Sequence, residues 1–257
     1  MCARFSQTNR SAIRTLTSSA GGENLTKDAQ WEGVYSTKNF ACSPPADEVS
    51  VRMADLLVCE NLAHKIMAQF GVTSAKSQIL KEENQLFLEI ERFDRTGALG
   101  RRGVISLRAL ALEFAGTLGS WSAISMGLVK EKLLSEELHL KIRQLEIFGK
   151  LIGNSDMHPG NLSFFIDEKM RIQDLAPIYD MLPMAYYPRQ NQIIHYAYQP
   201  DLPRPEESDL WKKASQMAIE FWSKASTSVE ISSGFKTIAS ENRKTLNTIV
   251  KAADEIF

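Results

Sequence analysis

A polar loop between two apolar runs, at residues 153–163, constrains the fold of this chain more than any other stretch. Residues 145–152 before the loop place apolar side chains at helical steps, which is typical of the end of a helix. Residues 162–166 after the loop form a short apolar run, which is typical of a buried strand. The chain therefore changes from helix to strand around a loop whose polar groups need hydrogen-bond partners or water.

Four polar side chains in and after this loop suggest chemistry. Asp156, His158 and Asn161 share the loop, and Asp180 follows a short hairpin, twenty-four residues after Asp156. Phosphoryl transfer needs a carboxylate that orients a hydroxyl nucleophile, with an amide and a second carboxylate that hold magnesium on the phosphates. Taken singly, Asp156 fits a turn cap, Asn161 an Asx-turn and Asp180 a surface charge. The occurrence of all three at these spacings favours a catalytic role over these structural ones, whereas His158 is also compatible with a structural role.

The hydrophobic pattern predicts strands mainly before the long helices, with the polar loop near the change-over. A helix at 53–70 is expected to end at Gly71, before a hairpin of residues 77–80 and 85–93. The other expected elements are a strand at 104–106, helices at 107–118 and 135–152, strands at 162–166 and 170–173, a loop at 184–205 and two closing helices. The first 50 residues are irregular and predict either one or two short strands or an extended arm. This pattern indicates an α+β fold.

Composition argues against several classes of protein. With 257 residues, 44% of them apolar, the chain can bury a substantial core, as one large domain or two lobes. A formal net charge of −1, without a long run of either sign, argues against a dedicated nucleic-acid binder. No apolar run approaches the roughly 20 residues of a membrane span, and residues 1–14 do not resemble a secretory signal. Three cysteines without metal-ligand spacing fit a reducing compartment, so we expect a cytoplasmic protein.

The motif Asp-x-His-x-x-Asn-Leu-Ser at 156–163, followed by Tyr-Asp at 179–180, resembles the catalytic and metal-binding segments of HipA-type serine/threonine kinases. These kinases are the toxin components of bacterial type II toxin–antitoxin systems. The stretches at 91–95 and 18–22 are also similar to that family and occur in the same order. The resemblance covers roughly residues 17–257. It implies a two-lobed, protein-kinase-like α+β fold, with a small β-rich N-lobe at 1–95 and a mainly helical C-lobe at 96–257.

The resemblance also implies a role for each matching residue. Asp156 would be the catalytic base that orients the substrate hydroxyl, and Asn161 and Asp180 would bind Mg²⁺. His158 would lie near the nucleotide phosphates. The remaining implied contacts with the nucleotide are the backbone of Glu91 and Phe93 at the adenine edge and the side chain of Tyr179 at its border. A core aromatic is equally compatible with Tyr179, and Arg92, Asp94 and Arg95 are better interpreted as local ion pairs.

Two further implied sites lie near the N-terminus. Gly21 and Gly22 belong to a small-residue loop whose backbone N–H groups would approach the ATP phosphates. Ser18 matches the serine that the family autophosphorylates at the start of this loop, and Ser19 is adjacent. Family members usually carry further sequence before this loop. We therefore expect a short or N-terminally truncated member of the family, with an incomplete N-lobe.

One position departs from the family pattern. HipA-type kinases have a strand that ends in a phosphate-contacting lysine shortly before a proline, whereas here Ala41 and Cys42 precede Ser43-Pro44. Lys38 is the nearest basic residue and Lys27 is the other candidate. Either lysine substitutes for the family lysine, or the N-lobe is degenerate.

The implied activity is ATP- and Mg²⁺-dependent phosphorylation of protein serine or threonine, and two alternatives stand beside it. The implied substrate is a translation component such as an aminoacyl-tRNA synthetase, and the implied partner is a small helix-turn-helix antitoxin of HipB type. We expect no direct binding of this chain to nucleic acid or membrane. The first alternative is a pseudokinase that binds nucleotide or an antitoxin without catalysis. The second is a metal-dependent hydrolase built on Asp156, His158 and Asp180.

Overall fold

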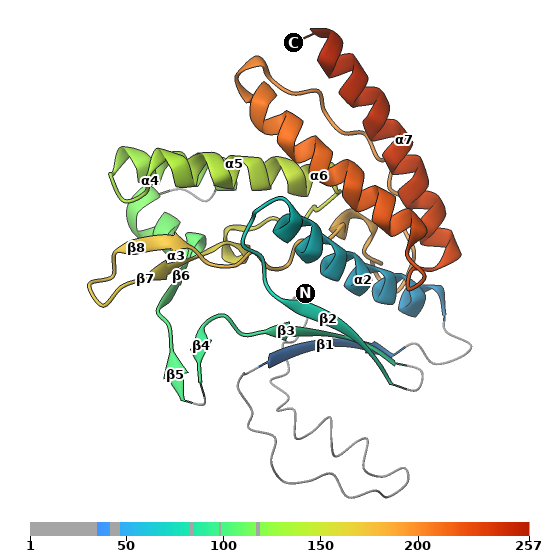
Figure 1. The fold of residues 1–257 in the computed structure, drawn as a ribbon, viewed down its shortest axis with the longest axis horizontal. Coiled ribbons are helices and arrows are strands. Elements are labelled where there is room, and N and C mark those ends of the chain that lie inside the picture. The colour runs from blue at the N-terminus through green and yellow to red at the C-terminus, as the bar shows by residue number, and fades with distance from the viewer. Residues whose placement is uncertain (1–34, 42–46, 83–84, 98, 117–118, 257) are drawn as a thin grey trace, which may run out of the picture.

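The computed structural model describes residues 35–41, 47–82, 85–97, 99–116 and 119–256 (Figure 1). Within these residues the strands form three small sheets, and most of the helical residues lie in the second half of the chain. The α+β fold expected from the sequence is confirmed. None of the helices in the described part of the chain combines the length and the apolar character needed to cross a membrane.

The first sheet is antiparallel and carries the predicted hairpin. Its strand order is β1-β3-β2, in which β1 is Tyr35–Ala41, β2 is Ser77–Glu82 and β3 is Gln85–Glu91. Leu86, Leu88 and Ile90 alternate along β3 and are buried, as expected for a strand with one face on a core. β1 confirms a strand in the irregular region before residue 50.

Helix α2, Glu48–Gln69, lies between this sheet and the C-terminal helices (Figure 1). The Asp47 carboxylate caps its N-terminus by accepting a hydrogen bond from the backbone N–H of Ser50 (2.8 Å). The chain leaves the helix through Gly71, which has a φ of 77° and is the predicted stop. The Asp55 carboxylate accepts hydrogen bonds from the backbone N–H (2.7 Å) and Oγ (2.6 Å) of Ser232, just before the last helix. Helix α2 is thereby fixed to the start of the last helix.

The other two sheets lead the chain towards the polar loop and away from it. β4 (Arg95–Thr96) and β5 (Gly100–Arg101) form a two-stranded hairpin, and β6 (Val104–Ser106), β7 (Ser163–Ile166) and β8 (Ile172–Leu175) form an antiparallel sheet in the order β6-β7-β8. The backbone N–H of Leu107 also donates to the carbonyl of Leu162 (2.8 Å). The strand that follows the polar loop is therefore held by β6, which lies more than fifty residues earlier in the chain.

The helical segment between β6 and the polar loop differs from the expectation. The helix expected at 107–118 consists only of α3 (Leu107–Leu110) and a π-helical turn (Ala111–Ala115), and it ends at Gly116 with a φ of 60°. The sequence pattern did not predict α4, Trp121–Lys130. Ser120 caps this helix by accepting a hydrogen bond from the backbone N–H of Ala123 (3.2 Å). Small and polar residues interrupt the periodic pattern of apolar residues in this helix, so the pattern does not indicate it.

The three long helices of the second half are those that the sequence predicts: α5 (Glu136–Leu151), α6 (Ser208–Thr227) and α7 (Ser233–Ile256). Trp222, on α6, is fully buried where these helices meet the loop before them. Its Nε1 donates to the carbonyl of Leu151 (3.1 Å), and the Tyr198 hydroxyl donates to the same oxygen (2.6 Å). These hydrogen bonds satisfy a terminal carbonyl of α5, which fixes the helix end from which the polar loop starts.

Candidate active site

The polar loop begins at a glycine that ends α5. Gly153 has a φ of 74°, a backbone conformation that favours glycine. The N–H of Asn154 donates to the carbonyl of Gly149 (2.8 Å), and the N–H of Gly153 donates to the carbonyl of Lys150 (3.0 Å). This pair of hydrogen bonds is the Schellman motif, which turns the chain away from the helix axis. It thereby fixes the direction in which the Asn154 side chain leaves the backbone.

Asn154 connects the two segments that carry the predicted catalytic and metal-binding residues. Its Oδ1 accepts a hydrogen bond from the backbone N–H of Asp156 (3.0 Å), and its Nδ2 donates to the backbone carbonyl of Asp180 (3.3 Å). The side chain is only 7% exposed, so water competes little for these hydrogen bonds. The sequence-based prediction missed Asn154. The signal in the sequence that could have indicated it is an asparagine directly after the glycine that ends the helix.

Asn161 lies next to Asp156 through a second amide contact. Its Nδ2 donates to the backbone carbonyl of Asp156 (3.0 Å), and its side chain is 8% exposed. Because the amide nitrogen is used in this way, the amide oxygen remains to bind a cation. The Asp156 side chain is itself exposed. The structure therefore brings two of the three predicted residues together within the loop.

The position of Asp180 is fixed by backbone hydrogen bonds of the residues before it. Two residues earlier, the N–H of Ile178 donates to the carbonyl of Thr73 (3.1 Å), and the carbonyl of Ile178 accepts from the N–H of Ala75 (2.9 Å). Asp180 has a φ of 53°, a left-handed conformation that is uncommon outside glycine and is tolerated best by Asp and Asn. Its half-buried carboxylate is thus held in a turn between the N-terminal sheet and the polar loop.

His158 makes the contacts of a turn-stabilising residue. Its Nδ1 accepts a hydrogen bond from the backbone N–H of Gly160 (3.0 Å), and its carbonyl accepts one from Trp121 Nε1 (3.1 Å). The first of these caps a 3₁₀ turn at Pro159–Asn161. A Cβ on Gly160 would lie 2.9 Å from the imidazole, so this position needs glycine. These contacts favour the structural role for His158, and Nε2 remains available at the exposed edge of the ring.

Tyr179 joins the polar loop to an aromatic cluster. Its hydroxyl donates to the carbonyl of Gly160 (2.9 Å) and lies 2.9 Å from Ser163 Oγ. Its ring stacks on Phe93 with centroids 5.8 Å apart, and Phe93 meets the edge of Phe165 at 6.0 Å. Burial raises the pKa of the Tyr179 hydroxyl above its ordinary value, so the hydroxyl stays a donor at neutral pH. Both interpretations of Tyr179, a core aromatic and a border of the nucleotide site, fit this position.

The predicted adenine edge follows β3. The N–H of Glu91 donates to the carbonyl of Lys76 (2.9 Å) and is therefore already used. Of the two backbone groups of Glu91, only the carbonyl could form a hydrogen bond with a nucleotide base. The N–H of Phe93 has no acceptor among the described residues. Asp94 accepts two hydrogen bonds from the Arg92 guanidinium (2.6 and 2.5 Å), which hold the pKa of Asp94 below its ordinary value. The expected ion pair of this segment is confirmed.

Several predicted residues of the N-terminal region are not placed relative to this site. Lys38 lies in β1, in register with Leu88 of β3, and its backbone position is all that the structure describes. Ser18, Ser19, Gly21, Gly22 and Lys27 lie outside the described residues. The phosphate loop and the autophosphorylation site therefore remain predictions.

The donors around Asp156 fit magnesium on a nucleotide better than a metal held by protein alone. Among the described residues, no three His, Cys, Asp or Glu side chains come together in a way that could hold a metal ion. Mg²⁺ commonly takes one or two protein ligands, with water and phosphate oxygens as the rest. The Asn161 amide oxygen and the Asp180 carboxylate are the two side-chain oxygen groups that the sequence predicts for this role. The geometry gives no support to a hydrolase built on Asp156, His158 and Asp180.

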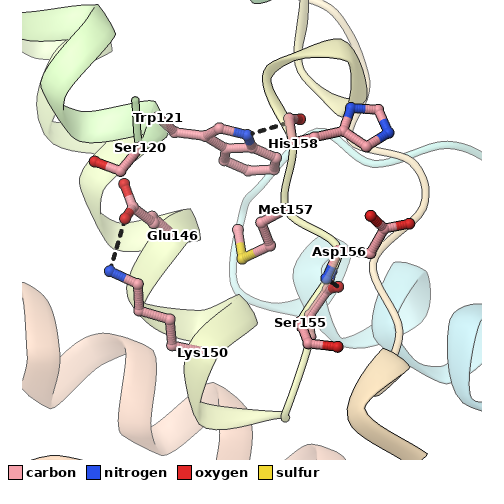
Figure 2. Close-up of a pocket in the computed structure, with 9 residues that line it drawn as sticks. Ser120, Trp121, Glu146, Lys150, Ser155, Asp156, Met157 and His158 are labelled. Carbon is pink, nitrogen blue, oxygen red and sulfur yellow. Dashed lines mark hydrogen bonds and ion pairs between the residues drawn. The ribbon is translucent and has the colours of Figure 1, made fainter. Parts of the chain in front are cut away.

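A cavity of about 410 Å³ opens beside Asp156, on the side of α4 and α5 (Figure 2). Figure 2 shows Trp121 and Met157 between Asp156 and an ion pair formed by Glu146 and Lys150. Met157 packs over Gly149, where any Cβ would collide with its sulfur. Neither predicted metal ligand lines this cavity. His158, which the sequence places near the nucleotide phosphates, does line it.

Comparison with known proteins agrees with the fold. Residues 37–255 match the HipA-like C-terminal domain family. The curated protein "Toxin YjjJ" of Escherichia coli (strain K12) is 37% identical over 203 residues, which cover 77% of this chain and 45% of that protein. The chain thus spans less than half the length of this relative.

Solved structures of low sequence identity share the fold. HipA of Shewanella oneidensis MR-1, in a complex with HipB and operator DNA, has a TM-score of 0.54 and 14% identity, covering 86% of this chain and 60% of that one. The Helicobacter pylori proinflammatory kinase CtkA has a TM-score of 0.56 and 13% identity, covering 87% and 92%. The match to the family extends over most of the sequence, so the chain belongs to the HipA-like C-terminal domain family.

Proposed function

We propose that this chain is an ATP- and Mg²⁺-dependent serine/threonine protein kinase of HipA type. The observation that carries the proposal is the pair of buried amides around Asp156. Asn154 binds the backbone of Asp156 and of Asp180, and Asn161 binds the backbone carbonyl of Asp156. One hydrogen-bond network therefore links an exposed carboxylate with two oxygen donors suited to magnesium.

In the proposed reaction, Asp156 accepts the proton of a substrate serine or threonine hydroxyl. The hydroxyl oxygen forms a bond to the γ-phosphorus of ATP, the bond to the β–γ bridging oxygen breaks, and ADP leaves. Magnesium, held by Asn161 and Asp180, would neutralise charge on the phosphates. The carbonyl of Glu91 and the N–H of Phe93 would bind the adenine, between an N-lobe at 1–95 and a C-lobe at 96–257. Tyr179, stacked on Phe93, would close one side of that position.

The biological setting is also a proposal. The 37% identity with a protein named a toxin supports a toxin component, and the HipA structure with HipB supports a small helix-turn-helix antitoxin as partner. We propose a translation component, such as an aminoacyl-tRNA synthetase, as the substrate. We further propose autophosphorylation at Ser18, or at Ser19, because a phosphate there would repel the ATP phosphates and hold the loop out of the site.

Separate measurement of nucleotide binding and phosphate transfer tests the proposal. Asp156→Asn should abolish transfer from γ-labelled ATP to protein and leave binding of a labelled Mg-nucleotide largely intact. Asn161→Ala and Asp180→Asn should weaken Mg-nucleotide binding itself. Asn242→Ala, a change of a buried amide that lies outside this site, is the matched control for general loss of folding. Binding by the wild type without any transfer would favour the pseudokinase, and equal loss of binding in all three site variants would contradict the separate roles.

A further inference from the structure

The cavity beside Asp156 continues into a second cavity of about 470 Å³. Both volumes lie in the range of roughly 300–1,000 Å³ that is typical of ligand sites. The two cavities share five lining residues from α4, α5 and the polar loop: Ser120, Glu146, Lys150, Asn154 and Ser155. They therefore form one groove that starts at Asp156, passes the C-terminal end of α5 and reaches the loop before α6. We call this the α5 groove.

One wall of the α5 groove is an irregular segment that precedes α6. Residues 193–203 have no regular secondary structure, and they make no backbone–backbone hydrogen bond within the described part of the chain. Tyr196 and Leu202 of this wall line the groove and are 37% and 45% exposed. Unpaired backbone beside exposed apolar side chains is what an extended polypeptide can bind, by adding main-chain hydrogen bonds and filling apolar positions.

The charges along the α5 groove favour a basic ligand. Four carboxylates line it, at Glu146, Asp156, Asp201 and Glu207, against the two cations Lys150 and Arg204. Three of these groups are engaged within the protein, because Lys150 lies 2.7 Å from Glu146 and Glu207 lies 3.2 Å from Arg143. Asp201 is exposed and makes no ion pair with the described residues, so it is the carboxylate that can meet a partner.

From this geometry we propose that the α5 groove binds the protein substrate, as an extended segment with a basic side chain near Asp201 and its serine or threonine at Asp156. The proposal rests on the kinase function proposed above, since it assigns the phosphoacceptor to Asp156. It adds a preference in the substrate sequence: lysine or arginine on the side of the acceptor that faces the loop before α6. An acidic flanking residue beside Asp201 would be repelled by its carboxylate, whereas Arg204 is the cation at the same end of the groove.

Short fluorescein-labelled serine peptides, flanked by arginine, by alanine or by glutamate, test the proposal by anisotropy. The wild type should bind the arginine peptide about tenfold more tightly than the glutamate peptide. Asp201→Lys should weaken binding of the arginine peptide by about fivefold or more and remove the preference. Leu202→Ser should weaken all three peptides alike. The control is Glu241→Lys, which makes the same charge change at an exposed site on α7 and should bind as the wild type does.

The outcomes separate this proposal from the kinase function. If wild-type protein binds the three peptides equally or not at all, or if Asp201→Lys and Glu241→Lys behave alike, the α5 groove is not the substrate site. The same peptides are then incubated with γ-labelled ATP and Mg²⁺. Binding that depends on Asp201 without phosphate transfer would support the groove and contradict the kinase. Transfer that is independent of the charge at position 201 would support the kinase and overturn the groove.

Discussion

The hydroxyl of Tyr179 donates to the carbonyl of Gly160, across the gap between the turn that carries Asp180 and the loop that carries Asp156. The same hydroxyl lies 2.9 Å from Ser163 Oγ. Together with Asn154 on the other side, Tyr179 makes the two segments one hydrogen-bonded unit. Residues that are far apart in the sequence motif are thereby held close together in the structure.

Removal of this hydroxyl should loosen the unit without disturbing the aromatic cluster. Tyr179→Phe keeps the ring against Phe93 and loses both hydrogen bonds, so we expect the free energy of unfolding to fall by about 1–2 kcal/mol. Ser163→Ala removes one of the two contacts and should cost about half as much. Urea denaturation measures both. A Tyr179→Phe variant as stable as the wild type would show that the hydroxyl holds nothing together.

Asn154 should position the site in addition to stabilising the fold. Asn154→Ala removes the contacts with Asp156 and Asp180, and we expect kcat at saturating ATP to fall by roughly tenfold or more, because small displacements of reacting groups are costly. The matched change is Asn242→Ala, which removes a buried amide that donates to the Tyr186 hydroxyl (2.7 Å). It should lose similar stability, about 1–3 kcal/mol, and little kcat at a temperature where both variants are folded. Parallel losses of kcat in the two variants would reduce Asn154 to a structural residue.

Two substitutions at Asp180 can distinguish the effect of losing the carboxylate from the effect of straining its left-handed backbone. Asp180→Ala and Asp180→Gly both remove the side chain, but alanine is strained at a φ of 53° and glycine is not. We therefore expect the alanine variant to be about 1 kcal/mol less stable than the glycine variant. Both variants, and Asp180→Asn, should require far more Mg²⁺ for nucleotide binding. Thermal unfolding and a magnesium titration give the two results independently.

Glu146 should make stability depend on acid pH. Burial alone would raise its pKa, but hydrogen bonds from Lys150 (2.7 Å) and from the N–H (2.7 Å) and hydroxyl of Ser122 outweigh burial and hold the pKa below its ordinary value of 4.5. Because the folded pKa is the lower one, the contribution of Glu146 is complete above pH 4.5 and is lost as the pH falls through the folded pKa. Glu146→Gln should lower stability at neutral pH by about 1–3 kcal/mol and flatten the acid limb of stability against pH. An unchanged acid limb would contradict this assignment.

The sequence predicts elements well where one face is apolar and the ends are marked. Ser135 and Gly153 bracket α5, and Gly71 ends α2, because capping and left-handed residues act locally. α4 was missed because its two serines and a glycine interrupt the apolar period, and its burial comes from packing against α5. Such packing is a tertiary effect that no local pattern reports.

The candidate site shows the same division. Asp156, Asn161 and Asp180 could be chosen from spacing and residue type, since the chemistry restricts which side chains serve. Asn154 could not, because its role depends on a Schellman turn that aims it at a carbonyl twenty-six positions later. The structural part of His158 likewise appears only with the 3₁₀ turn that it caps.

The two hydrogen bonds between Ile178 and residues 73–75 bear on how the protein could move. They attach the turn that carries Asp180 to the segment that leads into β2. A hinge motion that tilts the first sheet away from α5 must either carry Asp180 with it or break both bonds. In the proposed kinase, a motion that carries Asp180 away from Asn161 would separate the two proposed magnesium ligands, so bound magnesium would favour the arrangement described above.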